Sequence, residues 1–193
     1  MRKAIWTLGL VALPSWALYT YVFTDSFSTS INTTNWTING SITTSSGLLR
    51  TPGTSGSGSI IGKTMPGGDN EYEVRTRLTL PVSGGTFITY FRASSNAQSG
   101  PSAQGSYYAV ELQSPVVSGS SCGGTLAIYK RVSNVITTLY STYAPCRNGM
   151  EIRVVNRWGW LSVFLDGQHW VKLWETPTIT GFPGVGVRDV PSG

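Results

Sequence analysis

A strict alternation of apolar and polar side chains runs through residues 71–80 and limits what this segment can become. One set of alternate positions holds Tyr72, Val74, Thr76, Leu78 and Leu80, and the other holds Glu73, Arg75, Arg77 and Thr79. Successive side chains of a β-strand point to opposite faces of its sheet. The pattern therefore predicts an antiparallel strand with one face buried and the other in water.

Similar runs recur every 10–15 residues with turn-forming residues between them, and no 12-residue window after residue 17 carries a convincing 3.6-residue apolar stripe. We therefore expect an all-β fold, a two-sheet antiparallel sandwich, with no helix longer than two turns after residue 20. The other expected strands are 19–27, 36–43, 47–50, 60–63, 85–93, 106–114, 124–131, 135–143, 150–156, 160–165, 169–174 and 184–187.

The two cysteines, Cys122 and Cys146, lie at equal distances from Ser133-Asn134, a pair of residues typical of a tight turn. A hairpin centred there brings the two thiols opposite each other at its base. We expect a disulfide that closes a loop of about 25 residues, worth roughly 3 kcal/mol in the chain-entropy model. The alternatives are two buried thiols or half of a metal site, although two cysteines and one histidine do not build a closed zinc site.

Residues 1–17 have the layout of a cleavable secretion signal. Arg2 and Lys3 precede the apolar run 4–13, which Pro14 ends, and Ser15-Trp16-Ala17 places small residues where a signal peptidase reads. The run is shorter than the roughly 20 residues of a bilayer-spanning helix. We expect residues 18–193 to form one secreted, extracellular or cell-surface domain with no membrane span after signal removal. A retained N-terminal anchor is the alternative.

The charge pattern argues against a nucleic-acid partner. Removal of Arg2 and Lys3 lowers the net charge from +5 to +3, because 12 basic and 9 acidic residues remain. The basic residues are scattered and form no block. Charged residues make up only 12% of the chain, and Ser, Thr and Gly are abundant, as expected for an extracellular β-protein with a hydroxyl-rich surface.

Several motifs in order resemble the concanavalin A-like lectin/glucanase superfamily, in particular its laminin-G-like jelly-roll domains. The resemblance implies two curved antiparallel sheets, with ligands on the concave face or at the rim loops. It is carried by FTDSF at 23–27, Asn35-Trp36, Gly47-Leu48-Leu49, YEVRTRL at 72–78, YYAVEL at 107–112, LSVFLDG at 161–167 and GFPGVGV at 181–187.

The chain departs from that pattern after residue 187. In such domains another strand follows and pairs with the first strand, whereas here the sequence stops at Gly193. Either the first and last strands pair differently, or the chain is the front part of a longer secreted protein.

The carboxylates do not match the catalytic members of the superfamily. Those enzymes carry Glu-x-Asp-x-x-Glu on one strand, whose spacing suits retaining hydrolysis. Here Glu71 and Glu73 are followed by Arg75 and Arg77, which favours an exposed charged face. Glu111 is the best single carboxylate, with a solvated or arginine-paired role as the bland alternative. We therefore expect a non-catalytic protein and keep one enzymatic alternative, a hydrolase or lyase set at Arg77, Tyr107, Glu111, Gln113 and His169.

No cofactor is expected. The loop triplet Asp69-Asn70-Glu71 has oxygen ligands of the kind that calcium takes, although a loop cap before the next strand is favoured.

Tryptophans crowd the last third of the chain. Trp158 precedes Gly159 in an expected turn, so we predict that its indole is exposed and take it as a candidate ligand contact that stacks on sugar faces. Of Trp160, Trp170 and Trp174, we expect two to fill the core between the sheets.

A polar, aromatic-edged patch is expected on the concave sheet, with at least four of six residues on one solvent-facing surface. They alternate with a buried set at Val74, Phe91, Tyr108 and Val110, and one bulge between Phe87 and Arg92 would move Arg92 to the other side. The six are Arg75, Arg77, Arg92, Tyr107, Glu111 and Gln113. Such a patch suits hydroxyl-rich ligands.

These observations favour an extracellular recognition module for glycans or another surface polymer. A structural protein that self-associates through exposed strand edges is the remaining alternative.

Overall fold

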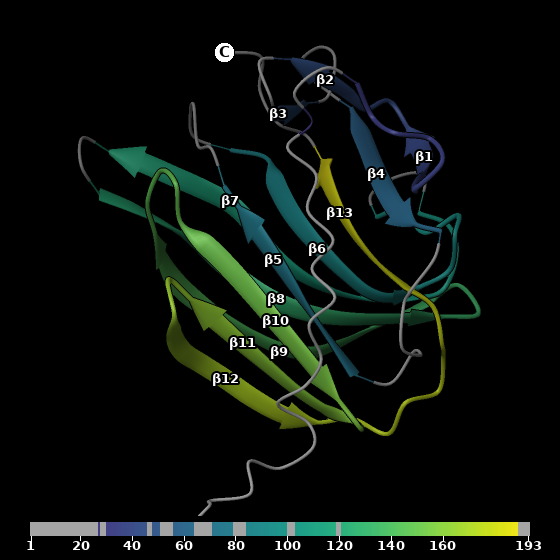
Figure 1. Ribbon diagram of the computed structural model, residues 1–193. Coiled ribbons are helices and arrows are strands. Elements are labelled where there is room, and N and C mark those ends of the chain that lie inside the picture. Colours follow the sequence, from purple (N-terminus) through teal and green to yellow (C-terminus); the bar gives the residue numbers. More distant parts are fainter. Residues whose placement is uncertain are drawn as a thin grey trace, which may run out of the picture.

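The computed structural model describes residues 27, 30–45, 48–50, 56–63, 71–78, 84–99, 103–118 and 121–188. Every regular element in these ranges is a β-strand, and two antiparallel sheets form a sandwich (Figure 1). The prediction of an all-β jelly-roll sandwich is confirmed. The expected secretion signal at 1–17 and nearly all of the expected strand at 19–27 lie outside the described residues. No described helix has the length and apolarity needed to cross a membrane.

The larger sheet has seven strands, and the last described strand lies inside it. Figure 1 shows β13 (Phe182–Arg188) running between β4 (Ser57–Gly62) and β6 (Thr86–Ala93). A Cβ at Gly184 would lie 2.5 Å from the Ile60 carbonyl oxygen, so the close approach of β4 requires glycine there. The order is completed by β1 (Trp36–Gly40) beside β4, and by β7 (Tyr107–Ser118), β8 (Ser121–Val132) and β9 (Val135–Cys146) beyond β6.

The smaller sheet has four strands. Its order is β12 (Gln168–Trp174), β11 (Trp160–Leu165), β10 (Glu151–Arg157) and β5 (Glu71–Arg77). A separate short pair joins β2 (Thr43–Ser45) to β3 (Leu48–Arg50). The alternating run that predicted a half-buried strand is therefore β5, at one edge of this sheet.

Three hairpins close through two-residue turns. Ser133-Asn134, Trp158-Gly159 and Asp166-Gly167 all have positive φ at both residues, which matches the right-handed twist of the flanking strands. All three turns lie where the sequence predicts them, and the second leaves Trp160 as the first residue of β11.

The main core lies between the two sheets. The seven-stranded sheet contributes Val110, Leu112, Leu126 and Ile128, and the four-stranded sheet contributes Ile152, Val154, Leu161 and Val163. Each is at most 3% exposed, and burial of such a side chain stabilises the fold by roughly 1.5–3 kcal/mol. Phe91, Tyr108 and Val110 are buried here as predicted.

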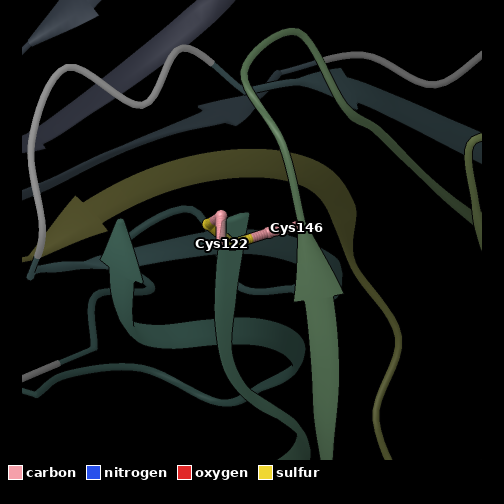
Figure 2. Close-up of a disulfide and its surroundings, with 2 residues drawn as sticks. All are labelled: Cys122 and Cys146. Atoms are coloured by element: carbon pink, nitrogen blue, oxygen red, sulfur yellow. A yellow bond between two sulfur atoms is a disulfide. The ribbon is translucent and has the colours of Figure 1, made fainter. Parts of the chain in front are cut away.

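The predicted disulfide between Cys122 and Cys146 is confirmed. The two residues face each other directly across β8 and β9, with their Cα atoms 4.8 Å apart (Figure 2). β9 is the edge strand among the described residues, so the bridge ties the outermost described strand of the sheet to β8.

Replacement of both cysteines, Cys122→Ser with Cys146→Ser, is expected to lower the free energy of unfolding by about 3 kcal/mol, because the unfolded chain regains the entropy of a closed loop. Urea unfolding followed by circular dichroism measures the change. Two alkylated thiols in the intact mass of unreduced wild-type protein would contradict the bridge.

Candidate functional site

The six residues of the predicted patch do not share a surface, so that prediction is wrong. Arg75 and Arg77 belong to β5 in the four-stranded sheet and are exposed on its outer face. Tyr107, Glu111 and Gln113 lie on the outer face of the seven-stranded sheet, because Tyr108, Val110 and Leu112 occupy the core side of β7. At most three of the six residues therefore share a face.

Arg92 lies between the sheets because of a β-bulge. The register of β13 with β6 moves from Phe182 opposite Ala93 to Gly184 opposite Tyr90, and Arg92 has a φ of 49°. Its side chain is only 2% exposed. The Nε atom donates to Asn156 Oδ1 at 3.2 Å and Nη1 donates to the Ile179 carbonyl at 3.4 Å. Arg92 therefore connects β6 to β10 as a buried structural residue.

Glu111 is buried in a hydrogen-bonded group that we call the Glu111 cluster, made of Ser99, Glu111, Gln113, Tyr129 and Arg188. The carboxylate, 2% exposed, accepts hydrogen bonds from Ser99 Oγ at 2.8 Å and Gln113 Nε2 at 2.7 Å. Arg188 Nη2 forms an ion pair with it at 3.2 Å. Gln113 also donates to the Tyr129 hydroxyl at 3.0 Å. The arginine-paired role considered for Glu111 is the one observed.

Residues 97–99 cover this part of the seven-stranded sheet. Ala97 packs in an apolar group with Ile61, Tyr90 and Tyr107, and Gln98 donates to Ser57 Oγ at 2.9 Å. The rings of Tyr90 and Tyr107 meet edge to face at 5.3 Å. Burial raises the pKa of both phenols, so they remain neutral hydrogen-bonding groups. The chain itself therefore occupies the place where the sequence predicted an open polar site.

The enzymatic set is not brought together. Arg77 and His169 belong to the four-stranded sheet, whereas Tyr107 and Glu111 lie on the far face of the other sheet. Glu111 is paired with an arginine, an arrangement that does not supply the carboxylate pair of a glycoside hydrolase. For calcium, Asp69 and Asn70 lie outside the described residues, as does the side chain of Glu71. Among the described residues, no three His, Cys, Asp or Glu side chains gather as a metal site.

The tryptophans give a different result from the one predicted. Trp158 is 67% exposed, as expected, but Trp160 and Trp174 are also 43% and 55% exposed. Only Trp170 packs against the core, so the expectation that two of the three are internal is wrong. In β11, Leu161, Val163 and Leu165 point inward, which forces Trp160, Ser162 and Phe164 outward. The polar Ser162 at an alternate position was the signal in the sequence that could have shown this.

Trp160, Phe164 and Trp174 form an aromatic surface together with nearby basic residues, on the side of the four-stranded sheet away from the core. We call this surface the outer face. Trp160 and Trp174 face each other across β11 and β12 with their rings 5.1 Å apart. Lys172 Nζ lies 4.4 Å from the Trp160 ring centre, and the Arg153 guanidinium carbon lies 3.8 Å from that of Phe164. Cations so placed are attracted by the ring quadrupole.

Charged side chains cover the rest of the outer face. Glu73 pairs with Arg75 on its own strand and with Arg153 Nη1 at 3.2 Å on β10. One carboxylate thus serves two guanidinium groups. Its hydrogen bond raises the pKa of Arg75 further above the ordinary value, so this arginine stays charged.

The fold is similar to several solved structures. Carbohydrate-binding module CBM66 from Bacillus subtilis matches with a TM-score of 0.59 and 11% identity, over 80% of this chain and 88% of that chain. A protein of unknown function with a galectin-like fold, also from Bacillus subtilis, gives 0.55 and 12%, over 84% and 87%. The carbohydrate recognition domain of Emp46p, in its potassium-bound form, gives 0.53 and 13%, over 86% and 85%.

These matches confirm the resemblance in fold to concanavalin A-like jelly rolls, and at such identities they show the fold alone. No protein-family model and no curated protein matches the chain.

The Glu111 cluster yields a stability prediction. Glu111→Gln removes the buried negative charge that pairs with Arg188, and it should lower the free energy of unfolding by about 2 kcal/mol. Glu73→Gln disrupts exposed ion pairs and should cost less than about 1 kcal/mol. Urea unfolding of both variants tests the contrast. Equal losses would show that the Glu111 cluster does not stabilise the fold in this way.

Proposed function

We propose that the chain is an extracellular glycan-recognition module. We propose that it contacts its ligand through the end of the outer face that carries Trp160 and Trp174. The observation that carries the proposal is the exposure of three indoles: Trp160 and Trp174 on the outer face, and Trp158 in the adjoining turn between β10 and β11. A domain of this size can bury such large apolar side chains. Here the alternation of side chains along β11 and β12 leaves Trp160 and Trp174 exposed to solvent. Exposed apolar patches on a soluble domain mark sites of contact with another molecule.

Sugars suit this surface because they present apolar C–H faces and hydroxyl edges. An indole offers a flat apolar face and one N–H donor, so it can stack and donate at once. Lys172 and Arg157 lie beside the tryptophans and can donate to hydroxyl or ring oxygens.

Two further observations support the proposal. CBM66 and the Emp46p domain, which share the fold, are carbohydrate-binding by name. The disulfide between Cys122 and Cys146 suits an oxidising compartment, in agreement with the predicted secretion signal.

The tryptophans provide the direct test. Trp158→Ala and Trp174→Ala should each weaken polysaccharide binding by about tenfold, because a buried aromatic contact is commonly worth 1–2 kcal/mol or more. Affinity electrophoresis in gels containing different polysaccharides measures this. Tyr143→Ala is the matched control, since Tyr143 is an aromatic residue that is 70% exposed on β9 of the other sheet. Wild-type affinity in both tryptophan variants, or no binding to any polysaccharide, would refute the proposal.

Self-association is a second candidate function, favoured by one edge of the seven-stranded sheet. β9 carries no Lys, Arg, Asp or Glu, and its residues 135–138 are all exposed, with Val135 at 64% and Ile136 at 54%. The other described edges are better protected: β1 has five residues, β5 carries charges and β12 carries Lys172, whereas β9 has only a bulge at Leu139. Natural sheets use such devices to prevent edge pairing. A second copy could therefore extend the sheet at β9.

A lysine on that edge should prevent such pairing. If β9 joins two copies, Thr138→Lys will reduce the oligomeric fraction in sedimentation velocity by several-fold, because the edge gains a charge. Thr178→Lys, at an exposed threonine between β12 and β13, should leave it unchanged. A wild-type protein that is monomeric at high concentration removes this candidate function.

A further inference from the structure

We propose that the outer face selects acidic polysaccharides, whose sugars carry carboxylate or sulfate groups, over neutral ones. The inference rests on the proposed function, because it assumes that the outer face is the glycan-binding surface. It adds the chemical class of the ligand, and the evidence lies in how charged and aromatic groups are arranged on that face.

Basic residues outnumber acidic ones on this face. Among the side chains that the structure describes, strand register places five basic residues and two acidic ones on the outer face. The seven are Arg75, Arg77, Arg153, Arg157 and Lys172, with Glu73 and Glu151.

The register also orders these groups into rows that cross the strands. Trp174, Trp160 and Arg157 form the first row, and Lys172 lies in the second. The third row is made of His169, Phe164, Arg153 and Arg75. Alternate residues of a strand are separated by roughly 6.5–7 Å, so the third row lies about 13 Å from the first. A sugar chain stacked on the tryptophans and running along the strands would pass first Lys172 and then the arginine pair.

The cations on this path are held in place yet keep donors available. Arg153 lies over Phe164, and an arginine stacked on a ring still presents the N–H groups at its edge to a planar anion. Lys172 lies over Trp160 in the same manner. Ordered side chains lose less conformational entropy when a ligand binds.

The arginines exceed the carboxylates that could neutralise them. Glu73 is shared by Arg75 and Arg153, and the Arg75 side chain is still 59% exposed. Guanidinium groups match carboxylates and other oxyanions through paired hydrogen bonds. The carboxylate or sulfate of an acidic sugar can therefore accept hydrogen bonds from the guanidinium N–H groups that Glu73 does not bind. A neutral sugar offers no charged acceptor for them.

The experiment compares polymers that differ only in charge. Polygalacturonate is compared with its methyl-esterified form, and dextran sulfate with dextran, by isothermal titration at moderate salt. We expect at least one acidic polymer to bind about tenfold more tightly than its neutral partner. A preference confined to polygalacturonate assigns carboxylate as the group recognised, and one confined to dextran sulfate assigns sulfate.

Variants separate selection by this face from general attraction to a basic protein. Arg75→Gln with Arg77→Gln should weaken acidic-polymer binding by about three- to tenfold and leave neutral-polymer binding unchanged. Lys63→Gln is the control for loss of one positive charge, because Lys63 is exposed and directly follows β4 of the seven-stranded sheet. If Lys63→Gln weakens acidic-polymer binding as much as Arg75→Gln does, the attraction is general and the inference is overturned.

The two proposals fail in different ways. Equal binding of the acidic and neutral partners, with loss of both in Trp174→Ala, overturns the acidic selectivity and leaves the glycan-binding function standing. Absence of binding to these polymers and to every other polysaccharide overturns both. Circular dichroism and urea unfolding confirm that each variant is folded, as expected for exposed substitutions.

Discussion

The packing of the four-stranded sheet against the seven-stranded sheet determines which side chains this protein presents to water. Because side chains alternate along a strand, burial of Leu161 and Val163 in the core places Trp160 and Phe164 outside. A one-residue shift in register would exchange these sets, burying a serine and exposing the core leucines. The outer face therefore exists because of the core on the other side of the same strands.

The outer surfaces of the two sheets differ in how far their side chains are covered and hydrogen-bonded. On the seven-stranded sheet, residues 97–99 pack over Tyr90 and Tyr107, and Glu111 is satisfied by Ser99, Gln113 and Arg188. A buried carboxylate with an arginine and two hydrogen-bond donors has its polar requirements met within the fold. On the four-stranded sheet, aromatic and basic groups remain in contact with solvent, and their partners only partly satisfy them.

Local features of the sequence predicted local structure well. The alternation, the Ser133-Asn134 and Asp166-Gly167 turns and the opposed cysteines are all properties of neighbouring or hairpin-paired residues. The structure agrees with them, for the alternation over residues 72–78. The candidate patch failed because it required knowledge of which distant strands pair. β5 joins β10 and not β7, and a bulge turns Arg92 inward. Register between strands far apart in sequence depends on the global core, which no single segment encodes.

The same reasoning explains why tryptophan was misleading in this chain. Large aromatic side chains are usually buried, so the average behaviour favoured the core for Trp160 and Trp174. The neighbouring sequence indicates the opposite, because each tryptophan lies two residues from a polar residue on the same face of its strand. These polar residues are Ser162 on β11 and Lys172 on β12. An aromatic side chain at an outward-facing strand position does not pack in the core. Its exposure is the observation on which we base the proposed ligand contact, and the cations stacked on the rings are the reason why we propose an anionic ligand.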